Sequence, residues 1–266
     1  MGTEVRSTET GLIFEVEDQV FKAGDKVAVA FRSPNFKGIT GFQGTLNLTN
    51  DYLQFDNLNT NGSIVKSSIV NSQIPHSSLL DSRSSLNMTA NNFGTRWEHE
   101  GLITMSWNTN TSLDLKEDEV LFTMNFIAKT SGRLSEVLRI GSQKTIAESY
   151  EGKGELGNLS IRFVGKNGKE ITGKSELYQN YPNPFDQRTV IGINLATAGR
   201  GSFKITDVTG RIVKVIEKDW TKGYHEVWLD RREIQASGVL YYSFEGMPTA
   251  QPGQAFRAVK KMVIVE

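Results

Sequence analysis

The chain has 266 residues, and its 30 Lys and Arg residues balance 30 Asp and Glu residues, so the formal net charge is zero. This balance gives no electrostatic reason to expect nucleic acid or an anionic membrane as a partner. The absence of cysteine excludes disulfides, thiolate metal sites and a cysteine nucleophile. No apolar run approaches the roughly 20 residues that a membrane helix requires.

The start of the chain differs in composition from the residues after it. Residues 1–9 carry no apolar core of the kind found in an export signal. We expect residues 1–9 to be a disordered or expression-derived start, and the chain to be a fragment of a larger precursor.

Alternation of apolar with polar residues, the pattern of half-buried strands, dominates residues 10–165. Gly, Asn and Ser separate the alternating runs at the short spacing typical of a β-sandwich. The segment 57–92 is instead rich in Asn and Ser, which leaves open a functional or flexible loop, a short helix or an additional strand pair. The predicted strands are 27–31, 45–48, 52–55, 102–107, 120–127 and 159–164.

A glycine-rich and charged segment separates the two halves, and its composition predicts a linker at residues 166–176. Residues 168–175 also match the spacing of a phosphate-binding loop. Such a loop requires a helix that begins at its lysine, and no alternating strand and helix pattern surrounds this one. We therefore interpret the segment as a linker and not as a nucleotide site.

The second half repeats the alternating pattern over a shorter length. Two prolines, Pro182 and Pro184, fix φ near its start and prevent a helix from continuing there. The two halves together predict an all-β protein with two β-sandwich domains in tandem. The predicted strands of the second half are 190–195, 202–206, 211–216, 226–229, 239–244 and 257–265.

Five motifs follow one another in this second half. They are LYQNYPNPF at 177–185, VTGRIV at 208–213, GYHEVW at 223–228, SGVLYY at 237–242 and KKMVIV at 260–265. Their order resembles the type A C-terminal sorting domain of the type IX secretion system, which is found in Bacteroidetes. The resemblance covers residues 177–266 and implies a small, immunoglobulin-like sandwich of seven strands.

This resemblance also implies a route and partners. The cargo would pass through the periplasm, be recognised by the type IX translocon, and be cut near the start of the domain by a sortase-like protease. It would then be secreted or attached at the cell surface.

By analogy, the recognition determinants lie in the terminal strand, which could engage a partner by edge pairing. The alternative is that this strand only completes the sheet, and Glu266 stands where such domains frequently end in lysine or arginine. The terminal candidates are Lys260, Lys261, Met262, Val263, Ile264 and Val265. A second candidate group begins the domain and consists of Asn180, Tyr181, Pro182, Asn183, Pro184 and Phe185.

In residues 10–165, motifs at 38–48, 52–55, 101–107 and 121–126 follow in an order that is similar to a cohesin-type domain. That resemblance implies a jelly-roll sandwich of nine strands. Cohesins bind dockerin modules through one sheet face and nearby loops, so a dockerin-like module is one expected partner. A spacer role is the alternative, because fold alone does not establish function.

The remaining motifs favour a non-catalytic protein without a cofactor. Glycoside hydrolysis needs two carboxylates around a cleft and stays open as a third hypothesis, but no nucleophile elbow or zinc-binding helix occurs. Asp114 and Asp118 are candidate calcium ligands, although a solvated turn is the preferred interpretation. Trp97 and Trp107 could stack on sugars, so the alternative function is a carbohydrate-binding module that contacts surface polysaccharide. For Trp107, which lies on an alternating strand, a buried core position is the preferred interpretation.

Overall fold

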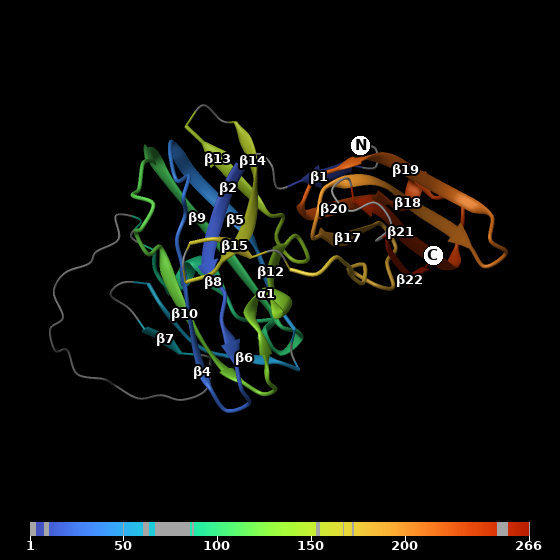
Figure 1. The fold of residues 1–266 in the computed structure, drawn as a ribbon. Helices are drawn as coiled ribbons and strands as arrows, with labels where there is room; N and C mark the ends of the chain where they lie inside the picture. Colours follow the sequence, from blue (N-terminus) through green and yellow to red (C-terminus); the bar gives the residue numbers. More distant parts are fainter. Residues whose placement is uncertain are drawn as a thin grey trace, which may run out of the picture. The chain divides into compact units, whose positions relative to one another are not determined.

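The computed structural model describes residues 4–7, 11–49, 51–60, 64–66, 86, 88–152, 155–166, 168–171, 173–248 and 255–265. The chain divides into two compact units (Figure 1). The first unit is Gly11–Ile171, and the second is Thr172–Glu266 together with a strand from the N-terminal end. Both consist almost wholly of strands, which confirms the prediction of two all-β sandwiches in tandem. Within the described ranges, no helix is long and apolar enough to span a membrane.

The strands of the first unit include nine with four residues or more and several shorter ones. A short helix α1 (Leu134–Val137) and two 3-10 turns, η1 (Ala90–Asn92) and η2 (Glu98–Glu100), lie between them. The strands are β2 (Gly11–Glu17), β3 (Val20–Phe21), β4 (Lys26–Phe31), β5 (Ile39–Leu48), β6 (Leu53–Asn59), β7 (Ile64–Lys66), β8 (Phe93–Gly94), β9 (Leu102–Leu113), β10 (Phe122–Ala128), β11 (Gly132–Arg133), β12 (Leu138–Gly141), β13 (Glu148–Glu151), β14 (Leu156–Val164) and β15 (Glu170–Ile171).

Two main sheets of the first unit enclose its core. One runs β15-β14-β13-β5-β9-β8, with β12 paired to β5 and β2 parallel to β14, and the other runs β4-β10-β6-β7. Phe31 and Phe122 lie opposite one another across β4 and β10, and their stacked rings are 4.5 Å apart. Phe14 from the other sheet meets Phe122 edge-on at 5.7 Å, so aromatic side chains join the two layers.

Two parts of the first unit refine the sequence expectations. In the Asn-rich segment, β7 pairs with β6, whereas Ile69, Val70, Leu79 and Leu80 lie outside the described residues. In the expected linker, Glu170–Ile171 forms β15 and pairs with the end of β14, so these residues belong to the first sandwich. After Lys174, where a phosphate-binding loop would need a helix, the chain instead forms a strand at Glu176–Leu177.

In its described residues, the second unit contains seven strands of its own sequence. They form the sheet β20-β17-β16 and the sheet β19-β18-β21-β22, and a 3-10 turn, η3 (Arg231–Glu233), follows β20. The strands are β16 (Glu176–Leu177), β17 (Arg188–Leu195), β18 (Gly199–Asp207), β19 (Ile212–Trp220), β20 (Gly223–Asp230), β21 (Gly238–Pro248) and β22 (Phe256–Ile264).

Large aromatic side chains fill the interior of the second unit. Trp220 is buried, its ring meets Phe244 edge-on at 5.2 Å, and its Nε1 donates to the carbonyl of Gly201 at 3.1 Å. A Cβ at Gly201 would lie 2.8 Å from the ring of Phe244, so this close approach requires glycine.

The N-terminal end contributes an eighth strand to this unit. β1 (Glu4–Ser7) pairs antiparallel with β20, from Glu4 opposite Trp228 to Ser7 opposite His225. The prediction of a disordered start is therefore wrong for these four residues, because their main-chain groups pair with the edge of β20. Residues 1–3 and 8–9 lie outside the described ranges.

Candidate functional site

The residues that begin the second unit form a continuous ladder with β17. We call residues 176–185 the opening segment. Leu177 lies opposite Ile193, and the amide of Tyr178 donates to the carbonyl of Gly192 at 2.9 Å. Tyr181 and Val190 then exchange two main-chain hydrogen bonds of 2.9 Å. The first half of the opening segment is thus an edge of the sheet that contains β17.

The end of the opening segment pairs with the other sheet, along the outer edge of β22. The amide of Phe185 donates to the carbonyl of Val263 at 3.1 Å, and the amide of Val265 donates to the carbonyl of Phe185 at 3.0 Å. Oδ1 of Asn183 accepts from the amide of Val263 at 2.9 Å, and Nε2 of Gln179 donates to the carbonyl of Lys261 at 2.8 Å. The opening segment therefore joins the two sheets of the sandwich.

A buried polar cluster fixes this crossing. The phenol oxygen of Tyr242 accepts from the amide of Asn180 at 2.9 Å and donates to the carbonyl of Tyr178 at 2.8 Å. Nδ2 of Asn180 donates to Oγ1 of Thr189 at 2.9 Å and to the carbonyl of Pro182 at 3.0 Å. Burial raises the pKa of the Tyr242 phenol, which therefore stays neutral and keeps its donor proton.

The structure brings together the two candidate groups that the sequence placed at either end of the domain. Within the terminal group, Met262 and Ile264 are buried in the core and Val263 is half-buried, whereas Lys260, Lys261 and Val265 are exposed. Within the other group, Asn180 and Phe185 are buried and Tyr181 is half-buried, whereas Pro182, Asn183 and Pro184 are exposed. Both groups therefore combine core residues with residues that a partner can reach.

The edge of β22 is covered over only part of its length. Neighbouring residues in an antiparallel strand direct their main-chain groups to opposite sides. Main-chain groups face the opening segment at Lys261, Val263 and Val265. Because the pattern alternates, the main-chain groups of Arg257 and Val259 face the same side of β22. Among the described residues, no main-chain hydrogen bond is made to the outward main-chain groups of these two residues, and Val259 is 64% exposed. This part of the edge is open to a further strand.

The calcium candidates of the first unit, Asp114 and Asp118, make hydrogen bonds within the protein. Oδ1 of Asp114 accepts from the amide of Gly38 at 2.6 Å, and the carbonyl of Asp118 accepts from Nε of Arg32 at 3.2 Å. Both side chains are exposed, and the described part of the chain contains no group of three or more His, Cys, Asp or Glu residues that could hold a metal. Asp114 fixes a turn.

Trp107 belongs to the core, as its place on an alternating strand favoured, and so cannot form a sugar-stacking platform with Trp97. The Trp107 side chain is 5% exposed, its Nε1 donates to the carbonyl of Leu86 at 2.7 Å, and its ring stacks on Phe42 at 5.5 Å. Trp97 is half-buried, with Nζ of Lys144 placed 4.9 Å from its ring centre. The two indoles therefore do not share an exposed face.

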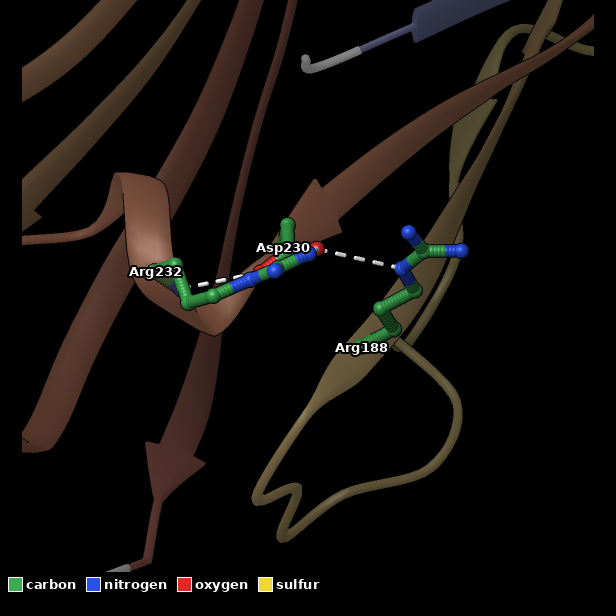
Figure 2. A network of polar contacts seen from close by, with 3 residues as sticks. All are labelled: Arg188, Asp230 and Arg232. Carbon is green, nitrogen blue, oxygen red and sulfur yellow. Dashed lines mark hydrogen bonds and ion pairs between the residues drawn. The ribbon is translucent and has the colours of Figure 1, made fainter. Parts of the chain in front are cut away.

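Sequence reasoning missed a polar network where β17 begins and β20 ends (Figure 2). Arg188 and Asp230 lie opposite one another in the ladder, and Arg232 follows in η3. Oδ2 of Asp230 accepts from Nε of Arg188 at 3.2 Å and from Nη2 of Arg232 at 2.7 Å. The hydrogen bonds from Arg232, followed by that from Arg188, hold the pKa of Asp230 well below its usual range. The only sequence signal was an Asp-Arg-Arg triplet directly after an alternating strand.

Comparisons with known proteins add distant similarities in fold. No family model matches the chain, and no curated protein matches it. A chain of a type I cohesin–dockerin complex from Clostridium thermocellum is 11% identical, with 58% of this chain and 99% of that chain covered and a TM-score of 0.36. A type II cohesin dyad from the ScaA scaffoldin of Acetivibrio cellulolyticus is 11% identical, with 90% and 89% covered and a TM-score of 0.37. Dimeric latent PorU from Porphyromonas gingivalis is 14% identical, with 100% and 20% covered and a TM-score of 0.29.

Proposed function

We propose that this chain is a non-catalytic part of a secreted cell-surface protein. Its second unit acts as the sorting domain for type IX secretion, and its first unit is a protein-interaction or spacer module. The observation that carries the proposal is the pairing between the opening segment and β22. The first and the last of the five motifs that carry the sorting-domain resemblance lie together on one folded surface, as a recognition element on a folded cargo requires.

In this proposal, the translocon contacts the side chains of the terminal strand that remain accessible. Lys260, Lys261 and Val265 are exposed, and the two lysines directly follow the open part of the β22 edge. Met262 and Ile264 act indirectly, because their burial holds the strand in place.

The segment between the two units is short, and this restricts the positions at which a sortase-like protease could cut without damage to either unit. β15 ends at Ile171 and belongs to the first sandwich. The carbonyl of Lys174 accepts from Nδ2 of Asn194 at 2.9 Å, and Leu177 is 1% exposed, so the chain is bound to the second sandwich from Lys174 onward. We place the cut between Ile171 and Lys174. A cut after Leu177 would remove a core residue from the sorting domain.

For the first unit, the partner would be a dockerin-like module, with a spacer role as the alternative. The carbohydrate-binding alternative loses its platform because Trp107 belongs to the core. The proposed localisation, at the cell surface or outside the cell, follows from the sorting role.

A secretion assay tests the sorting role. The full chain is placed behind an export signal and a fluorescent reporter, in a host with a working type IX system. A Lys260→Gln, Lys261→Gln double variant is compared with a control double variant, Lys204→Gln with Lys218→Gln, from the same sheet. Point variants are preferable to removal of the terminal strand, since that truncation also deletes the buried Met262 and Ile264.

We expect the unmodified chain and the control variant to reach the cell surface, and the Lys260 and Lys261 variant to accumulate in the periplasm. If the unmodified chain stays in the periplasm, the sorting role is wrong. If all three reach the surface equally, the domain is a sorting signal but these two lysines are not its determinants.

A further inference from the structure

We propose that the second unit binds a phosphate group, free or as a phosphate monoester, at the arginine cluster around Asp230. The cluster lines an open cavity of about 460 Å³. The cavity lies where β17 begins and β20 ends, and it is lined by Asp186, Gln187, Arg188, Asp230, Arg231 and Arg232. This inference is independent of the sorting role, because it uses neither the terminal strand nor the opening motif.

Asp230 organises the cluster but has no acceptor capacity left for a ligand. Its Oδ1 accepts from the amide of Arg232 at 3.0 Å and from Nε of Arg232 at 2.9 Å. Its Oδ2 accepts from Nη2 of Arg232 at 2.7 Å and from Nε of Arg188 at 3.2 Å. A carboxylate offers about four lone-pair positions, and all four are in use. The residue is only 6% exposed, so it orients two guanidinium groups from below the surface.

The arginines keep donors that this carboxylate does not use. Figure 2 shows the two terminal nitrogens of Arg188 directed away from Asp230. Within the described ranges no group pairs with these nitrogens, and half of the Arg188 side chain is exposed. Arg232 likewise engages Nε and Nη2 and leaves Nη1.

Arg231 completes the cavity wall in a fixed position. Its amide donates to the carbonyl of Gln187 at 2.7 Å, and its Nη1 donates to the carbonyl of Ile234 at 3.0 Å. The first bond holds η3 against the residue before β17, and the second fixes the Arg231 side chain along η3, so the cavity is a preformed feature. A preformed site avoids part of the ordering cost that binding otherwise carries.

The charge balance favours an oxyanion. Three arginines face two acids, Asp186 and Asp230, which leaves one net positive charge at the cavity in a chain whose total is zero. The planar guanidinium group matches the spacing of phosphate oxygens and donates two parallel hydrogen bonds to them. A phosphate has enough oxygens to accept from Arg188 in β17 and from Arg232 in η3 together.

Titration of the full, isotope-labelled chain tests the inference by NMR. The probes are inorganic phosphate, glucose 1-phosphate, and vesicles of phosphatidylcholine with or without phosphatidic acid. We expect saturable shifts at the amides of 186–188 and 230–232, and about a tenfold loss of affinity in Arg188→Gln. Arg257→Gln, an exposed arginine paired with Glu245 on the other sheet, should bind as the unmodified chain does.

The probes also distinguish the source of the phosphate. Binding of both soluble probes supports a site for free phosphates and monoesters, whereas binding only to phosphatidic acid vesicles supports a lipid phosphate at the same arginines. If no probe binds, or if Arg188→Gln and Arg257→Gln weaken binding equally, the inference is wrong and the cluster is a structural clasp. Arg232→Gln replaces Arg188→Gln if the latter unfolds.

Discussion

Replacement of Tyr242 by phenylalanine tests how the opening segment is held. The change removes only the hydroxyl oxygen from a fully buried side chain, so the aromatic ring keeps its packing contacts. It leaves the buried amide of Asn180 without its acceptor, at about 2 kcal/mol, and the half-buried carbonyl of Tyr178 without its donor, at about 1 kcal/mol. The free energy of unfolding of the second unit should therefore fall by about 2–3 kcal/mol.

Urea unfolding, followed through the NMR signals of β21, measures this change separately from the first unit. With a slope of about 1–2 kcal/mol per M, the midpoint should move down by roughly 1–3 M. Tyr241→Phe is the matched control, because the Tyr241 side chain is 40% exposed on the opposite face of β21. That control should stay within about 0.5 kcal/mol of the unmodified chain. Equal effects of the two variants would refute the reasoning.

The stabilisation by Tyr242 should also depend on pH, because the pKa of its phenol is raised in the folded unit. Because burial raises this pKa in the folded unit, the stabilisation is complete below the ordinary tyrosine pKa of about 10 and declines as the pH rises beyond it. The stability difference between the unmodified chain and Tyr242→Phe should therefore shrink above pH 10.

Two further predictions concern other parts of the second unit. Hydrogen bonds from Thr209 and then from Arg211 lower the pKa of Asp207 to about 2, so its stabilisation is present above the usual pKa and is lost as the pH falls through about 2. The destabilisation by Asp207→Asn, measured by thermal unfolding, should vanish near pH 2, and a difference that is constant from pH 2 to 7 would contradict this. Deletion of residues 1–7 should speed hydrogen exchange at alternate amides of 225–228 by about tenfold or more, because β1 covers that edge of β20. Unchanged exchange there would mean that β1 does not protect the edge.

Local pattern in the sequence accounts for most of the fold. Each predicted strand of the second half overlaps an observed one, because alternation records which side of a strand is buried. The predicted strands ended too early where polar residues continue the pairing with a neighbouring strand. β19 runs on to Trp220 through Glu217, Lys218 and Asp219, since an edge strand with a solvent face tolerates charge. β9 likewise runs on to Leu113 through a polar Asn and Thr stretch, which lies beyond the two residues that pair with β8.

Pairing between distant segments is the part of the fold that the sequence did not predict. The strand at Glu4–Ser7 has no hydrophobic pattern that distinguishes it, and its partner β20 lies at the other end of the chain. The arginine cluster depends on the register that places Arg188 opposite Asp230. A shift of that register by one residue would turn one side chain to the other face of the sheet, and neither residue alone specifies it.

The geometry of β22 changes what kind of signal the terminal motif can be. As a linear sequence, the motif at 260–265 presents six side chains, but the fold commits Met262 and Ile264 to the core and pairs the main chain of Val263 with the opening segment. If the second unit has the proposed function, the partner therefore binds a surface formed jointly by β22 and the opening segment, which exists only when the sandwich is folded. Tyr242→Phe leaves Lys260 and Lys261 in place and weakens only the attachment of the opening segment. If the partner recognises a folded surface, less of this variant should reach the cell surface, in proportion to its lost stability. If the partner recognises a linear tail, the amount at the cell surface should not change.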